Sequence, residues 1–141
     1  DLGVENTEIP TLLFVFFCFE RLQLLGRALQ NMKVIADHKT AYTTLTQEEL
    51  NSFNYVKGDT EGIVNYGLQI KGIHFAAIFI ENKEEKIIKI SFRSQGDFDV
   101  NQFARDYFHG GGHRNAAGGK SEETMEETIE KFENLVAKIS I

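Results

Sequence analysis

The sequence IHFAAIFIENKEEKIIKISFR, residues 73–93, decides the fold. Residues 73–81 are apolar on both alternating faces, which is typical of a central strand that is covered on both sides. The polar stretch NKEEK follows and predicts a turn. After it, Ile88, Ile90 and Phe92 alternate with residues that are mostly polar, as in a strand with one buried face. We therefore predict a β-hairpin here.

Helices and strands alternate before this hairpin. Residues 11–30 join an uninterrupted apolar run to leucines at helical spacing, and they predict a helix. A short extended piece at residues 33–35 and a strand at residues 40–45 follow. Residues 60–70 predict another helix, which begins after a turn at the sequence KGD.

A capping box marks the start of a helix between these strands and the hairpin. Thr46 and Glu49 have the required spacing, and Leu45 and Leu50 are placed for a hydrophobic staple. We expect this helix to end at about Tyr55.

A short helix, a strand and a long helix follow the hairpin. Asp99 is the expected N-cap of a helix that ends near Phe108, with Gly110 as the first residue beyond its C-cap. Residues 114–120 predict a short strand, and Ser121 is the expected N-cap of the last helix. The apolar residues of that helix recur at intervals of four and three, and they are Met125, Ile129, Phe132, Val136 and Ile139.

Together these elements predict an α/β (α+β) fold, a mixed and roughly five-stranded sheet that is flanked by helices on both faces. We divide the chain into an N-terminal apolar or linker helix, residues 1–32, and a domain, residues 33–141. The length of 141 residues suits one compact domain with its own core. A hydrophobic content of 42% and a charged content of 26% argue against disorder.

Charge is unevenly distributed along the chain, whose net charge is −6. Residues 122–141 hold six glutamates against two lysines, which gives −4. Residues 86–120 hold six lysines and arginines against three aspartates, which gives +3. An acidic protein is a poor candidate for binding a long duplex, because many phosphate contacts are needed there. The locally basic stretch remains compatible with a small phosphorylated ligand or the end of a strand.

Cysteine use and hydropathy favour a cytoplasmic protein that does not enter a membrane. Cys18 is alone, so no intrachain disulfide can form, which fits a reducing compartment. The apolar run from Leu12 to Phe19 is too short to span a bilayer, and no basic stretch precedes it as in a signal peptide. This run either is buried on both sides, covers an interface between domains, or drives self-association.

Residues 107–119, YFHGGGHRNAAGG, suggest an anion site. Glycines leave main-chain N–H groups accessible, successive N–H groups in a turn bind anions, and His113 adds another donor. Phosphate-binding P-loops and dinucleotide fingerprints do not fit, because these glycines follow a predicted helix. The alternative is a helix C-cap and tight turn beside a packed histidine, and three glycines taken alone favour it more.

Arg93 and Ser94 form a second candidate site at the end of a predicted strand. An arginine in this position can make a bidentate contact with phosphate. The alternative, which is about equally well supported, is a solvated arginine paired with Asp97 or Asp99.

The sequence offers no metal site and no catalytic pair. The four histidines are scattered, and no cluster of histidine or cysteine has the spacing of zinc ligands. His74 lies in an apolar strand and is interpreted as a core or sheet-face histidine. No nucleophile with an adjacent base can be identified.

The stretch ISFRSQGDFDVNQFARDYFHGGGHRNAAGG, residues 90–119, resembles the signature of the C-terminal DHH-associated domain (DHHA subfamily 1) of DHH-family phosphoesterases. The family includes nano-RNases that also act as phosphatases on 3′-phosphoadenosine 5′-phosphate. The stretches ERLQLLGRAL, TAYTTLTQEEL and GDTEGIVNYGLQIKGIHFAAIF are also similar to that family, so the resemblance covers roughly residues 20–140.

The resemblance implies a division of labour between two domains. In such enzymes an N-terminal domain with an Asp-His-His motif holds a manganese pair, and the C-terminal domain binds the phosphate and terminal nucleotide of the substrate. This sequence has no Asp-His-His motif, so we expect no catalytic residue, metal or cofactor in the chain. The residues that would contact or shape the substrate site are Arg93, Ser94, Gly110, Gly111, Gly112, His113, Asn115 and Ala116.

The implied function is that of a substrate-binding domain in a manganese-dependent phosphoesterase. Its ligands would be short RNA or DNA oligonucleotides or nucleotide phosphates, and its partner would be an N-terminal DHH catalytic domain. We expect no hydrolase activity from the chain alone. Similar domains occur in alanyl-tRNA synthetases, so a tRNA-binding or dimerisation module, with a homodimer, stays open as the alternative.

Overall fold

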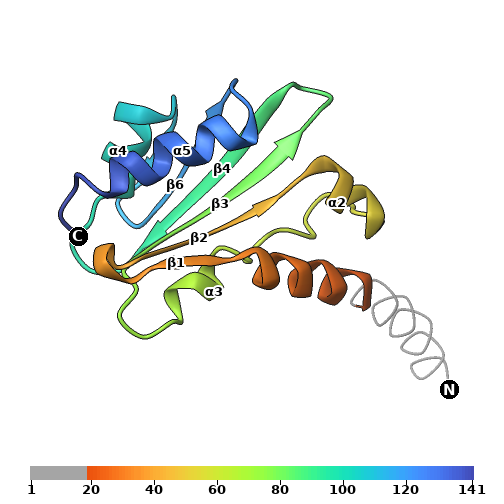
Figure 1. The fold of residues 1–141 in the computed structure, drawn as a ribbon, viewed down its shortest axis with the longest axis horizontal. Helices are drawn as coiled ribbons and strands as arrows, with labels where there is room; N and C mark the ends of the chain where they lie inside the picture. Colours follow the sequence, from red (N-terminus) through yellow and green to blue (C-terminus); the bar gives the residue numbers. More distant parts are fainter. Residues whose placement is uncertain (1–18) are drawn as a thin grey trace, which may run out of the picture.

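The computed structural model describes residues 19–141, which form a six-stranded mixed sheet with helices on both faces (Figure 1). Its strand order is β1-β2-β3-β4-β6-β5. The strands are β1 (Lys33–Ile35), β2 (Thr40–Leu45), β3 (Phe75–Asn82), β4 (Ile87–Ser94), β5 (Gly111–His113) and β6 (Ala116–Ser121). Strands β2 and β3 are parallel, and the other neighbours are antiparallel. The fold class is confirmed, with one strand more than expected because the glycine stretch forms β5.

The predicted hairpin lies at the centre of this sheet. Strands β3 and β4 pair from Phe75 opposite Ser94 to Asn82 opposite Ile87. Ile88, Ile90 and Phe92 are buried, as their alternation predicts. Because its apolar face is buried, β4 has a fixed register, and the residue at its end, Ser94, has a fixed position relative to the core.

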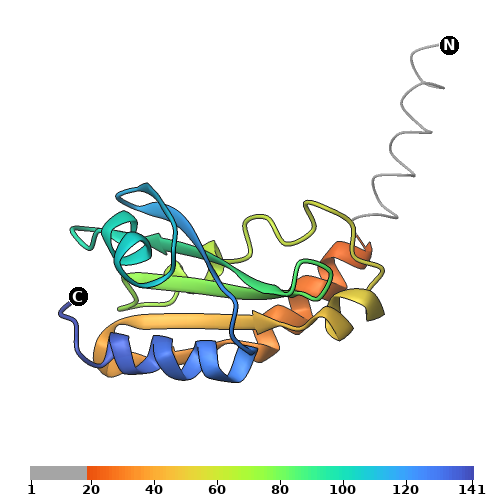
Figure 2. The same cartoon turned by 90° about the horizontal axis from the view of Figure 1, so that it is seen from above.

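The helices divide between the two faces of the sheet. They are residues 19–31, α2 (Gln47–Ser52), α3 (Asn65–Leu68), α4 (Val100–Tyr107) and α5 (Met125–Val136), with a 3-10 turn η1 (Ala36–His38) before β2. Helices α4 and α5 supply the core on one face. Helix 19–31, α2 and the segment around α3 supply the core on the other. Figure 2 shows α5 running alongside β2. The rings of Tyr42 in β2 and Phe132 in α5 lie 5.5 Å apart between centroids.

Aromatic side chains fill the core under α4 and α5. The Phe132 ring of α5 lies 5.6 Å from that of Phe75 and 5.0 Å from that of Phe79, measured between centroids. The Phe103 ring of α4 lies 5.2 Å from that of Phe75. Burying each such side chain contributes about 1.5–3 kcal/mol, so the two helices are fixed on the sheet mainly by apolar contacts.

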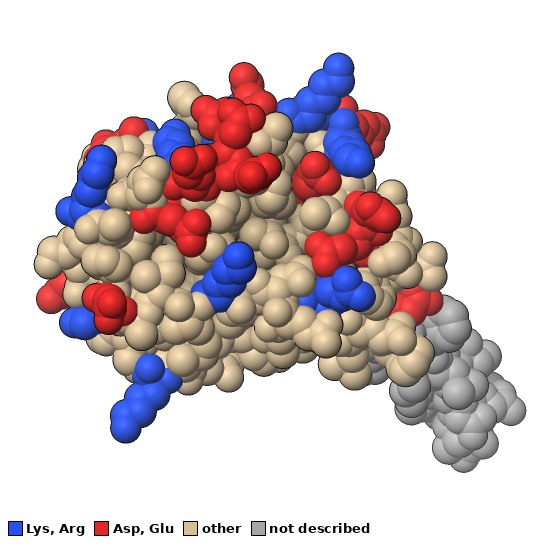
Figure 3. Space-filling view, in the orientation of Figure 1, with Lys and Arg blue, Asp and Glu red and all other residues tan. Residues whose placement is uncertain are grey.

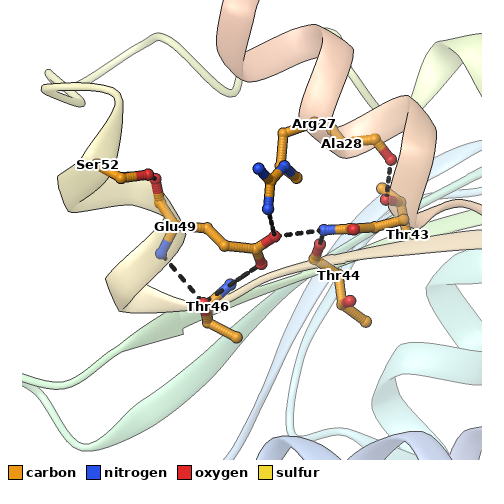
Figure 4. Close-up of polar contacts among 8 residues, drawn as sticks. Arg27, Ala28, Thr43, Thr44, Thr46, Glu49 and Ser52 are labelled. Carbon is orange, nitrogen blue, oxygen red and sulfur yellow. Dashed lines mark hydrogen bonds and ion pairs between the residues drawn. The ribbon is translucent and has the colours of Figure 1, made fainter.

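Glu49 joins helix 19–31 to the start of α2 (Figure 4). The capping box is confirmed, because Thr46 Oγ1 accepts from the Glu49 amide and the Glu49 carboxylate accepts from the Thr46 amide. The same carboxylate accepts from Asn31 Nδ2 at 2.9 Å and from Arg27 Nη1 at 3.4 Å. Burial alone would raise the pKa of Glu49, but the hydrogen bonds from Asn31 and Thr46, together with the nearby Arg27 charge, leave it lowered.

Two helices are shorter than the sequence predicts. Helix α2 ends at Ser52 because Asn54 adopts a left-handed φ of 52°, and the Tyr55 amide donates to the Leu50 carbonyl to close the helix end. The helix expected at residues 60–70 is reduced to the single turn of α3. Gly62, with a φ of 85°, interrupts it.

Two predicted caps are wrong by a few residues. Thr124, and not Ser121, caps α5, since its hydroxyl accepts from the Glu127 amide. Ser121 is the last residue of β6, and its hydroxyl bonds to that of Thr128. After α4, His109 takes the left-handed conformation that we expected at Gly110, with a φ of 51°.

The described residues begin at Phe19, the last residue of the predicted apolar run. The rest of that run, from Leu12 on, lies outside them, and so does the single cysteine Cys18. Within residues 19–141, no helix is long and apolar enough to cross a membrane. The division of the chain at residue 32 stays a prediction.

Candidate functional site

Arg93, Ala116 and His113 lie in one row across three strands. Arg93 of β4 is directly opposite Ala116 of β6, and Ala116 is directly opposite His113 of β5. Side chains of directly opposed residues lie on the same face of a sheet. Strands are about 4.8 Å apart, so the Cα atoms of Arg93 and His113 are separated by about 10 Å. Two long polar side chains thus flank a methyl group.

This row is accessible from solvent. His113 is exposed, and Arg93 and Ala116 are half-buried. On the other side of Arg93, its β3 neighbour Ala76 is buried under α3, where a Cβ added to Gly67 would lie 3.0 Å from the Ala76 Cβ. The core under helix 19–31 therefore borders the row without covering it.

The Arg93 guanidinium has no carboxylate partner within residues 19–141. Its Nη1 donates to the Phe92 carbonyl oxygen at 2.9 Å. Asp97, one of the predicted partners, instead lies 3.7 Å from Arg114 Nη2, and Asp99 accepts from the Gln102 amide as the N-cap of α4. The structure thus shows neither of the expected ion pairs, and it leaves the other N–H groups of Arg93 available to an anion.

Ser94 and Asn115 join the end of β4 to the turn between β5 and β6. Ser94 is 5% exposed, and its hydroxyl donates to the Phe98 carbonyl oxygen at 2.7 Å. Asn115 Nδ2 donates to the same hydroxyl at 2.9 Å, and the Ser94 amide donates to the Asn115 carbonyl oxygen at 3.1 Å. These bonds fix the turn that carries His113 beside the strand that carries Arg93. A direct contact of Ser94 with substrate stays a prediction.

The three glycines form an edge strand and its entry rather than a loop. A Cβ at Gly110 would lie 1.9 Å from the Gly118 carbonyl oxygen, and a Cβ at Gly112 would lie 2.6 Å from the Ala116 carbonyl oxygen. No side chain fits between backbones at these distances. Glycine is therefore required here by the close approach of β5 to β6, before any ligand is considered.

Asn101 of α4 holds this strand, and no pattern in the sequence pointed to that role. Its Oδ1 accepts from the Gly112 amide at 2.8 Å and from Arg105 Nε at 3.0 Å. The Gly110 amide donates to the Ala104 carbonyl oxygen at 3.2 Å, so two of the N–H groups that we expect to face a phosphate are bonded to α4. The glycines therefore offer fewer main-chain N–H groups to a phosphate than the sequence predicts. The solvent-accessible donors of the row are the side chains of Arg93 and His113.

His74 and the residue types that bind metals lie as follows. His74 is exposed and comes just before β3, so its interpretation as a core or sheet-face histidine within a strand is wrong. It lines a hollow of about 420 Å³ with Lys39 and Gln95. Within residues 19–141, no three side chains of histidine, cysteine, aspartate or glutamate converge as metal ligands would.

Comparison with known families identifies the domain that carries this row. The family model described as the DHHA1 domain matches residues 37–140. The chain belongs to the DHHA1 domain family. No curated protein matches this DHHA1 domain.

Solved structures with the same fold include DHH-family proteins. An exopolyphosphatase-related protein from Bacteroides fragilis is 47% identical, with a TM-score of 0.81 over 84% of this chain and 34% of that one. The pGpG-specific phosphodiesterase PggH from Vibrio cholerae is 15% identical, with a TM-score of 0.59 over 84% of this chain and 38% of that one.

A third structure, the DHH domain of a member of a ribosomal-protein family, is 15% identical with a TM-score of 0.57, over 92% of this chain and 33% of that one. The two structures that are 15% identical show the fold alone. The DHHA1 domain spans about a third of the length of these relatives.

Proposed function

We propose that this DHHA1 domain binds the phosphate and terminal nucleotide of a short RNA or DNA oligonucleotide or of a nucleotide phosphate. It would serve as the substrate-binding part of a manganese-dependent DHH phosphoesterase of the nano-RNase and 3′-phosphoadenosine 5′-phosphate phosphatase type. The observation that carries the proposal is the row in which Arg93 and His113 flank the small Ala116.

The chemistry of the row suits a phosphate. A guanidinium can bind two phosphate oxygens at once, and charge-assisted bonds of this kind are about twice as strong as neutral ones. The His113 ring supplies an N–H donor from the neighbouring edge strand. Ala116 leaves space between them. Ser94 and Asn115 act on the geometry, because their bonds set the position of the turn relative to Arg93.

The name of one solved relative points to the same class of ligand. The 47% identical protein is called exopolyphosphatase-related, and that name describes phosphate chemistry. Since the chain spans about a third of that protein, we assign the reaction itself to a partner domain.

Catalysis would depend on manganese held by an N-terminal DHH domain. Such metals lower the pKa of a bound water and stabilise the charge on the transferring group. The described residues offer no convergent set of ligands for them, so in this chain the row would only position the strand end. We expect the pure chain to release no phosphate from 3′-phosphoadenosine 5′-phosphate with added manganese. A cytoplasmic location is proposed with this activity.

Calorimetric titration of the full 141-residue chain tests the proposal. The ligands are 3′-phosphoadenosine 5′-phosphate and a short RNA, and the variants are Arg93→Ala and His113→Ala. A hydrogen bond to a charged group contributes about 1.5–3 kcal/mol, so we expect each substitution to weaken binding by roughly 10-fold to 100-fold. Arg21→Ala and His38→Ala are matched controls, since these residues lie on helix 19–31 and in η1, away from the row.

The controls should bind as the wild type does. Saturable binding that survives both Arg93→Ala and His113→Ala would show that the row is not the binding site. Binding of tRNA with no measurable binding of the nucleotide phosphate would instead favour the tRNA-binding module.

A further inference from the structure

Lys89 and Lys120 form a second cationic row on the same face. Lys89 of β4 is directly opposite Lys120 of β6. Lys89 lies four residues before Arg93 in β4, and Lys120 lies four residues after Ala116 in β6. Residues at even spacing along a strand share a face, so both lysines lie on the face of the first row. Both lysines are exposed. Strand β5 begins only at Gly111, and the segment before it lies beside Lys120, whose amide donates to the Phe108 carbonyl oxygen at 2.8 Å.

Two like charges directly opposite one another destabilise a sheet, so this pair calls for an explanation. Lys89 Nζ lies 3.2 Å from Glu85, but both side chains are more than half exposed, and such ion pairs contribute little. Within residues 19–141, Lys120 takes part in no ion pair. An anion that bridged the two lysines would remove their repulsion at little cost.

The distance between the two rows matches a strand of nucleic acid better than a mononucleotide. Four residues of β4 span about 13 Å, which exceeds the spacing of neighbouring phosphates on one strand. Between the rows the directly opposed residues are Ser91 and Gly118, which are small and half-exposed. A backbone can therefore pass over them from one row to the other.

We propose that Lys89 and Lys120 form a second phosphate subsite for a single-stranded oligonucleotide whose end is bound at Arg93 and His113. The inference rests on the proposed function and specifies its ligand as a strand of roughly three or more nucleotides, since about 13 Å separates the rows. A nucleotide phosphate would fill only the first row.

The surrounding charges restrict this ligand to a short strand. Lys120 borders a hollow of about 610 Å³ that is also lined by Glu122, Glu123, His109 and Lys131. The Lys131 ammonium donates to the Tyr107 carbonyl oxygen at 2.6 Å. A backbone that continued past Lys120 would meet the two carboxylates. Helix α5 covers the opposite face of the sheet, and its glutamates gather over that helix in the view of Figure 3, so a longer strand finds no track on that face either.

The test compares ligand lengths at several salt concentrations. Titrations of the full chain would use 3′-phosphoadenosine 5′-phosphate and a 5′-phosphorylated RNA tetranucleotide, with the double variant Lys89→Gln and Lys120→Gln. We expect unchanged affinity for the first ligand and roughly 10-fold weaker binding of the second. The slope of log K against log salt should fall by about 0.7 for each phosphate that the variant no longer neutralises. The double variant Lys33→Gln and Lys138→Gln makes the same change of charge elsewhere.

Each outcome decides between the claims. Equal tetranucleotide affinity and salt slope in the wild type and the Lys89/Lys120 variant would overturn this inference alone. Equal losses of affinity in both double variants would also overturn it, because only net charge would matter. No binding of either ligand by the folded wild-type chain would overturn the proposed function, and this inference with it.

Discussion

The glycines before and within β5 can be tested for their structural role separately from any ligand. Gly110→Ala places a methyl group 1.9 Å from the Gly118 carbonyl oxygen and 2.7 Å from the Gly119 Cα. Close C···O contacts begin at about 3.3 Å, so the two backbones must separate by about 1.4 Å at this point. Because both obstacles are main-chain atoms, no rotamer change can relieve the clash.

The expected cost follows from two opposing terms. Overpacking of this kind typically costs about 1–3 kcal/mol, and replacing glycine by alanine returns about 0.4–1 kcal/mol through the unfolded state. We therefore expect Gly110→Ala to lower the free energy of unfolding by about 1–2 kcal/mol. Gly118→Ala is the matched control, since its Cβ would meet only the Ile90 carbonyl oxygen at an ordinary 3.5 Å.

Urea denaturation followed by far-ultraviolet circular dichroism measures both free energies of unfolding. The control should equal the wild type or be slightly more stable, because it keeps the gain from the unfolded state. Equal unfolding midpoints for Gly110→Ala and Gly118→Ala would refute the argument that close packing of β5 on β6 requires glycine.

Two further predictions concern the anchors of the site and of helix 19–31. Asn101→Ala removes the acceptor of the Gly112 amide, so we expect faster hydrogen exchange at Gly112. The free energy of unfolding measured in urea should fall by about 1 kcal/mol. Unchanged exchange would contradict this. The lowered pKa of Glu49 means that its stabilising effect is complete above its unfolded-state pKa and is lost as the pH falls through the folded one. Below about pH 4.3, Glu49→Gln should therefore lose less stability on acidification than the wild type does, as measured by urea midpoints; parallel pH profiles would refute it.

Local signals in the sequence predicted most of the fold. The alternation of Ile88, Ile90 and Phe92 indicated which face of β4 is buried, and the spacing of Thr46 and Glu49 indicated where α2 begins. Both depend on residues only a few positions apart. Errors arose where one backbone conformation decided the outcome. The positive φ of Asn54 ends α2 earlier than predicted, and the positive φ of Gly62 interrupts the next predicted helix near its start.

The candidate site was predicted as a list of residues but not as an arrangement. Arg93 and His113 were both named, and it was their resemblance to a family motif that selected them. Their common row depends on the pairing of β4 with β6 and of β6 with β5, which joins residues about twenty positions apart. A contact of Ser94 with substrate stays a prediction, and the sequence did not indicate that its hydroxyl would bond to Phe98 and Asn115.

The sequence by itself determined the class of fold, the central hairpin and the local caps, because each follows from periodicity or from contacts between near neighbours. Only the tertiary structure decided that the glycines form an edge strand and that Lys89 lies opposite Lys120. Strand register causes this difference. It is set by the whole sheet and its two cores, and a shift of one residue would move every one of these side chains to the opposite face.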